Sequence, residues 1–111
     1  SHPYYKRDGA DIHMDLPISF YEAALGTEIT IPEPGGKSIK LKVPAGTQNG
    51  KTFRFKDHGA EDVKHKGSKG SFYVKVCIDI PTNLTEEERT LLQKLKEHDT
   101  RDLRSAMRKA N

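Results

Sequence analysis

Apolar and polar residues alternate with a period of two along much of the first eighty residues. Runs of this kind lie at residues 12–18, 27–31, 39–43, 53–55 and 72–80. The longest run, residues 72–80, places five apolar residues on one face. A period of two is typical of strands that bury one side. Strands with one wet face favour antiparallel sheets, so we predict a small all-β fold, an antiparallel β-sandwich.

Two short segments interrupt the strands with turn and cap residues. Ser19 to Leu25 is predicted to form a short helix, and Gly26 is expected to end it because glycine tolerates a positive φ. Further along, Asn49-Gly50 follows a strand that ends at Val43-Pro44 and is predicted to reverse a hairpin. The other glycines lie between strands and fit turns better than a phosphate-binding loop.

The period changes after residue 82. Thr85 followed three residues later by Glu88 predicts a capping box at the start of a helix. Apolar residues then follow at helical spacing, first as a narrow stripe and then again beyond Asp99. These residues are Leu91, Leu92, Leu95, Leu103, Ala106, Met107 and Ala110. The pattern fits either one bent helix or two.

Several segments, in this order, resemble a known family. Leu16–Gly26 and Val43–Lys51 are similar to the C-terminal client-binding region of DnaJ-type co-chaperones, and the resemblance extends to His2–Ile12 and Pro81–Glu87. It implies a fragment that contains the second C-terminal subdomain and a terminal helix. The expected parts are a joining segment (1–10), a β-sandwich subdomain (11–81) and a helical dimerisation tail (82–111). The loop Lys56–Gly70 and the tail after Asp99 depart from the family pattern.

The resemblance also implies a function. DnaJ-type proteins hold non-native polypeptides and deliver them to a seventy-kilodalton heat-shock ATPase in the cytoplasm. Matching positions give the client-binding residues as Met14, Leu16, Ile29, Ile31 and Phe72. The same five residues fall on the core-facing period, so a structural role is the alternative. The His-Pro-Asp signature of the J domain is missing, so this chain alone is not expected to stimulate an ATPase.

The resemblance further implies a homodimer joined through the C-terminal extension. The residues expected at that contact are Leu91, Leu92, Leu95, Leu103 and Met107. For the first three, packing against their own sandwich is an equally good reading.

Composition limits the other function classes. Apolar residues make up 33% of the chain and charged residues 32%, which predicts a thin core and a densely ionised surface. The only cysteine, Cys77, excludes a disulfide framework and is expected to be structural. His58 and His65 share an acidic loop but match no metal-ligand spacing. No apolar run has membrane-spanning length. We therefore expect no enzyme activity, metal, cofactor or membrane partner.

A basic β-domain that binds single-stranded nucleic acid is the second hypothesis. The net charge of +3 is weak for such a protein. The hypothesis requires Lys40, Lys42, Arg54 and the loop Lys64–Lys69 on one face, with an aromatic side chain among them.

Overall fold

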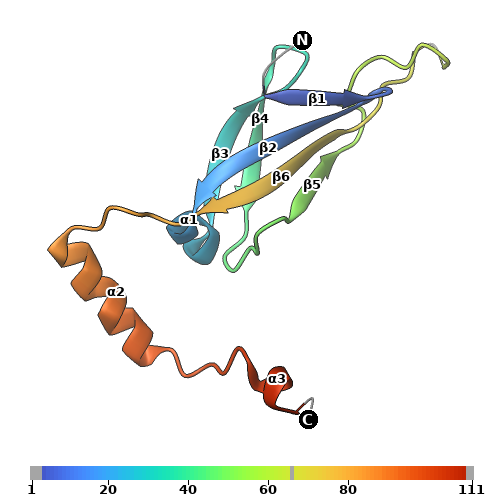
Figure 1. Ribbon diagram of the computed structural model, residues 1–111. Helices are drawn as coiled ribbons and strands as arrows, with labels where there is room; N and C mark the ends of the chain where they lie inside the picture. Colours follow the sequence, from blue (N-terminus) through green and yellow to red (C-terminus); the bar gives the residue numbers. More distant parts are fainter. Residues whose placement is uncertain (1–3, 66, 110–111) are drawn as a thin grey trace. The chain divides into compact units, whose positions relative to one another are not determined.

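The computed structural model describes residues 4–65 and 67–109 and divides into two compact units (Figure 1). The first unit extends to Ile80 and contains the sheets, and the second begins at Pro81 and is helical.

The first unit contains six strands and one helix among its described residues. They are β1 (Tyr5–Asp8), β2 (Asp11–Ser19), α1 (Phe20–Leu25), β3 (Thr27–Pro32), β4 (Ser38–Val43), β5 (Thr52–Phe55) and β6 (Phe72–Asp79). One sheet has the strand order β1-β2-β6-β5, and the other consists of β3 and β4 (Figure 1). The two sheets share one apolar core. The small all-β fold predicted from the alternation is confirmed.

The core consists of the inward residues of both sheets. Ile12, Met14, Leu16 and Ile18 of β2 are buried, and the residues between them are exposed. Phe72, Val74 and Val76 of β6 are fully buried opposite them in the ladder. From the smaller sheet come Ile31, Leu41 and Val43. At roughly 2 kcal/mol for each large side chain removed from water, this core is the main stabilising term of the fold.

The central strand pair departs from the antiparallel prediction. β2 and β6 run parallel, with Ile12 opposite Phe72 and Ile18 opposite Ile78, while the other three pairs are antiparallel. A parallel pair needs a long crossover. Here the crossover contains α1, the whole smaller sheet and β5.

The predicted hairpin at Asn49-Gly50 is wrong. Gly50 has the expected positive φ of 87°, but the turn connects β4 of one sheet to β5 of the other, and these strands do not pair. Asn49 instead connects this turn to β6, because its side-chain oxygen accepts a hydrogen bond from the Ile78 N–H at 2.9 Å. The Gly50 N–H also donates to the Val76 carbonyl at 2.9 Å, which extends the contact between the turn and β6.

The short helix α1 ends at Leu25 as predicted, and it begins one residue later than predicted, at Phe20 with Ser19 as its N-cap. The Ser19 hydroxyl accepts from the Glu22 N–H at 3.0 Å and the Glu22 carboxylate accepts from the Ser19 N–H at 2.8 Å, which forms a capping box. Gly26 ends the helix with φ 86°. The turn after β4 then packs on α1, since the Gly46 N–H donates to the Ala23 carbonyl at 2.8 Å. These contacts fix the start of β3 beside the end of β4.

The second unit contains two helices rather than one bent helix. They are α2 (Glu86–His98) and α3 (Ser105–Lys109). The predicted capping box is present at Thr85 and Glu88, and it holds the pKa of the Glu88 carboxyl below its usual range because that carboxyl accepts the Thr85 N–H. No residue of α2 is buried. Ala110 lies outside the described residues.

Candidate functional site

The five residues expected to bind a client lie together, but mostly inside the fold. Met14 and Leu16 on β2, Ile31 on β3 and Phe72 on β6 are buried in the shared core. Ile29 on β3 is only partly buried and packs against the edge of that core. Four of the five therefore expose at most 8% of their surface and offer little to a ligand in this conformation. Their role in client binding stays a prediction.

The smaller sheet is the part of the first unit with the most available strand edge. Among the described residues, β3 and β4 each have one neighbouring strand, so each leaves one side without a strand partner. On β4 the outward residues Lys40 and Lys42 are exposed, and such charges oppose pairing with another strand. On β3 the outward residues are Glu28 and Thr30. The β3 edge, with Ile29 beside it, is the better place for an added strand.

The end of β3 is tied to the larger sheet. The Tyr5 hydroxyl donates to the Pro32 carbonyl at 2.5 Å, and the Tyr5 ring meets Phe72 edge-on at 5.8 Å. Burial raises the pKa of Tyr5, and the Glu33 carboxylate nearby raises it further. This contact lies at the last residue of β3, and residues 27–31 precede it.

An apolar surface around α1 was missed by the sequence analysis. Tyr21 and Leu25 lie one turn apart on the helix and are exposed, Leu25 by 80%. Ile80 is also exposed and follows Asp79, which pairs with the N-cap residue Ser19. A single helical turn can bury only one side, and here Ala23 takes the buried position. The spacing of Tyr21 and Leu25 about Ala23 could have revealed this surface.

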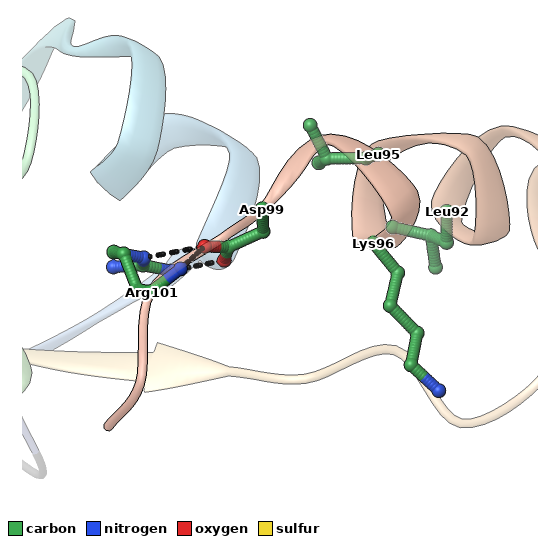
Figure 2. Close-up of a pocket in the computed structure, with 5 residues that line it drawn as sticks. All are labelled: Leu92, Leu95, Lys96, Asp99 and Arg101. Atoms are coloured by element: carbon green, nitrogen blue, oxygen red, sulfur yellow. Dashed lines mark hydrogen bonds and ion pairs between the residues drawn. The ribbon is translucent and has the colours of Figure 1, made fainter. Parts of the chain in front are cut away.

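The apolar residues of the second unit are largely exposed. Leu91, Leu95, Leu103 and Met107 expose between 59% and 73% of their surface, and Leu92 is partly buried. Figure 2 shows Leu92 and Leu95 beside Lys96 at the end of α2, where they line a groove of about 410 Å³ together with Asp99 and Arg101. These leucines therefore offer an apolar surface within their own unit.

One ion pair organises the end of α2. The Arg101 guanidinium donates to both carboxylate oxygens of Asp99, at 2.9 and 2.6 Å (Figure 2). The Arg101 N–H donates to the same carboxylate at 3.0 Å. The side-chain bond first and the backbone bond second lower the pKa of Asp99 to about 2.

The two loop histidines each contact one carboxylate. His58 Nδ1 lies 2.5 Å from Glu33 Oε2 and links the β5–β6 loop to the β3–β4 turn. His65 Nδ1 lies 3.1 Å from Asp62 Oδ2. The pKa of Asp62 is lowered, first by the N–H bond from Lys64 and then by His65. Within residues 4–65 and 67–109, no three His, Cys, Asp or Glu residues are grouped to hold a metal.

Cys77 is partly buried on β6, where its thiol points to the Lys75 carbonyl at 3.9 Å.

The basic residues required for nucleic-acid binding do not gather on one face. Lys40 and Lys42 point outward from the smaller sheet, whereas Arg54 points outward from the larger sheet, where its Nε donates to Ser71 Oγ at 3.0 Å. The two outward faces lie on opposite sides of the shared core. Lys66, within the predicted basic loop, lies outside the described residues.

No helix among the described residues is long and apolar enough to span a membrane.

Comparison with known proteins settles the family. Residues 1–81 match the DnaJ C terminal domain family. The chain belongs to this family. Chaperone protein DnaJ of Bacillus licheniformis is 45% identical over 96 residues, which is 86% of this chain and 25% of the relative. Chaperone protein DnaJ of Oceanobacillus iheyensis is 44% identical over 96 residues, with the same coverage of each chain.

A third relative gives the same picture. Chaperone protein DnaJ of Bartonella henselae is 41% identical over 93 residues, which is 84% of this chain and 24% of the relative. The chain thus spans about a quarter of the length of the curated DnaJ relatives it matches. The resemblance to the DnaJ C-terminal region is confirmed.

Proposed function

We propose that this chain is the part of a DnaJ-type co-chaperone that binds non-native polypeptides at the edge of β3. The observation that carries the proposal is the two-stranded sheet of a DnaJ C-terminal domain, in which β3 has a strand neighbour on one side only among the described residues. An extended client segment would add a strand along residues 27–31 and gain main-chain hydrogen bonds. Such bonds do not depend on the client's sequence, which suits a protein that receives many different clients.

Ile29 supplies the side-chain contact in this proposal. It is partly buried at the border of the core, whereas Ile31, two residues further along β3, is covered. A client side chain beside Ile29 would complete the burial of that isoleucine and add to the main-chain bonds. Met14, Leu16 and Phe72 would act through the core that holds β3 in place, without touching the client.

The full-length protein would act with a seventy-kilodalton heat-shock ATPase in the cytoplasm, as the family resemblance implies. The exposed leucines and Met107 of the second unit would join two copies of the chain. Two client sites in one dimer would then bind separate segments of the same unfolded polypeptide and gain avidity.

A binding titration tests the client site. The complete chain would be titrated against a fluorescently labelled, reduced and carboxymethylated lactalbumin, which stays unfolded. We expect weak binding without nucleotide that added salt changes little, because the contacts are main-chain and apolar. Ile29→Thr should weaken binding about fivefold, since it keeps the β-branched shape and removes apolar surface.

The matched control is Thr30→Ser, on the outward side of the same strand. It should bind as the unchanged chain does, and circular dichroism would check that both variants fold. Equal affinities for the two variants would contradict client binding at the β3 edge. Tighter binding of single-stranded DNA than of the unfolded polypeptide, with a steep loss in salt, would favour the nucleic-acid hypothesis instead.

A further inference from the structure

A largely covered carboxylate lies in the turn between β3 and β4. The side chain of Glu33 exposes only 11% of its surface, and its Oε2 lies 2.5 Å from Nδ1 of His58, whose side chain is 46% exposed. Within the described residues, neither side chain has another ion-pair partner. A covered carboxylate is costly unless it is paired, so the charge of His58 should matter for this turn.

His58 is held in place by the residues on both sides of it. Asp57, which precedes it, has a positive φ of 66°, an uncommon conformation outside glycine. Gly59, which follows it, donates its N–H to the Gly70 carbonyl at 2.8 Å. The His58 ring also meets the Phe55 ring edge-on at 6.3 Å. The imidazole is therefore carried by a fixed part of the β5–β6 loop.

The β3–β4 turn, residues 33–37, has fewer contacts. Gly35 and Gly36 at its tip are exposed. Gly36 has φ 91°, and an added Cβ there would have nothing within 4 Å. Among the described residues, the turn has one hydrogen bond beyond its internal bonds and the β3–β4 ladder, the bond between Glu33 and His58. That bond therefore joins the turn to the rest of the first unit.

The Tyr5 hydroxyl fixes the end of β3 just before the turn. It donates to the Pro32 carbonyl at 2.5 Å, one residue before Glu33. Burial first and the Glu33 carboxylate second raise the pKa of Tyr5 above 10.0, so the phenol keeps its proton between pH 5 and 8. Histidine is the side chain that changes charge in this range. A change of pH within it should therefore act on the turn and leave the end of β3 fixed.

We propose that the Glu33–His58 pair is a pH-sensitive switch that holds the β3–β4 turn against the β5–β6 loop when His58 is protonated and releases it when His58 is neutral. The physical reason is that a charge-assisted hydrogen bond is roughly twice as strong as a neutral one. The stabilisation is present at acidic pH and is lost as the pH rises. The neighbouring charges on the two segments, Asp57 and Lys37, are exposed, so water and salt screen them. The proposal does not depend on client binding at the β3 edge.

Nitrogen-15 relaxation of the complete chain at about pH 5.5 and about pH 7.5 tests the switch. The order parameter of the Gly36 N–H should be about 0.85 at the lower pH and fall toward about 0.6 at the higher pH. His58→Asn keeps an N–H donor close to the position of Nδ1 but carries no charge, so it should give the lower value at both pH values. An order parameter that is the same at both pH values in the unchanged chain would overturn the proposal, and so would the same fall in the variant.

A double-mutant cycle measures the pair itself. It compares His58→Asn, Glu33→Gln and the two together by urea unfolding, so that effects outside the pair cancel. The coupling, expressed as a change in the unfolding equilibrium constant, should be about fivefold larger at pH 5.5 than at pH 7.5. Equal coupling at the two pH values would contradict the proposal.

His65 and Asp62 provide the matched control. Their Nδ1 and Oδ2 atoms lie 3.1 Å apart in the same loop, but the side chains are 74% and 32% exposed and only three positions apart in sequence. This pair joins no separate elements. A cycle of His65→Asn and Asp62→Asn should give couplings that differ by less than about twofold between the two pH values. An equally large pH-dependent coupling in the control would overturn the assignment of the switch to Glu33 and His58.

Discussion

Gly26 shows how strongly one backbone position is determined by its neighbours. It combines φ 86° with ψ 153°, a conformation that is almost restricted to glycine. A Cβ at this position would also lie 3.0 Å from the Ala45 nitrogen and 3.2 Å from the Val43 oxygen. Both atoms are backbone and cannot move aside cheaply. The end of α1, the start of β3 and the turn after β4 therefore meet at a point with no room for a side chain.

Gly26→Ala should destabilise the first unit by about 2 kcal/mol or more, because backbone strain and steric overlap act together. Gly46→Ala is the matched control. Gly46 also has a positive φ, of 83°, but nothing lies within 4 Å of the added Cβ. We expect about 1 kcal/mol there. Urea unfolding curves would compare the two variants, and equal losses would show that the contact with Ala45 and Val43 does not matter.

The Asp99 carboxylate should titrate well below an ordinary aspartate. Its pKa falls from 3.8 to about 2, first because of the side-chain bond with Arg101. A lowered carboxyl pKa stabilises the folded form above pH 3.8, and this contribution is lost as the pH falls from about 4 toward 2. The pair is exposed, so the effect on overall stability should be small. An NMR titration of Arg101→Gln should return the Asp99 pKa toward 3.8, and an unchanged value would contradict the assigned cause.

At the scale of the element, the two-residue period predicted which side of each strand is buried. It did not predict strand direction or strand order. Ile12 to Ile18 of β2 alternate in burial as the sequence predicts, as do Leu41 and Val43 of β4. Strand direction could not be predicted, because alternation is the same in parallel and antiparallel strands. β1 was missed as well. Only Tyr5 in β1 is partly buried, so the strand has no apolar alternation to reveal it.

The candidate site shows the same limit. Met14, Leu16, Ile31 and Phe72 were placed on one inward face by their spacing, but spacing alone could not separate core from groove. That distinction depends on whether a second sheet covers the face.

The start of α2 gives a test at the element scale. Thr85→Ala should lower the helix content of the chain, because the Glu88 N–H loses its hydroxyl acceptor at 3.1 Å, at a cost of about 1 kcal/mol. Thr90→Ala is the control, since Thr90 is exposed inside the helix and alanine favours helix there. Far-ultraviolet circular dichroism should show opposite changes. A loss of helix in both variants would exclude the cap as the cause.

For the whole molecule, we expect a concentration-dependent dimer through the second unit. Leu103 and Met107 are 73% and 70% exposed, and replacing both by aspartate should produce a monomer because carboxylates would be buried at the contact. Light scattering across a concentration series would measure this. The interface is expected to be weak, since a few side chains bury less than a standard interface.

Gln93→Asp combined with Thr100→Asp is the matched control for the dimer. It adds two negative charges at exposed polar positions of the same unit, so the dimer should persist. A chain that is monomeric at every concentration would refute the dimer, and a dimer that survives the change at Leu103 and Met107 would refute this contact.

The parallel pairing of β2 with β6 has a consequence for how the chain is made. The Ser71 N–H at the start of β6 donates to Asp11 Oδ1 at the start of β2, across 60 positions of sequence. On a ribosome, β2 therefore emerges several seconds before the strand that completes its sheet, at synthesis rates of about 5–20 residues per second. Until then Ile12, Met14, Leu16 and Ile18 have no partner from β6, and the domain cannot close before Asp79 is free of the exit tunnel. A protein proposed to bind non-native polypeptides would thus itself be non-native for several seconds of its synthesis. During that time it resembles the polypeptides that it is proposed to bind.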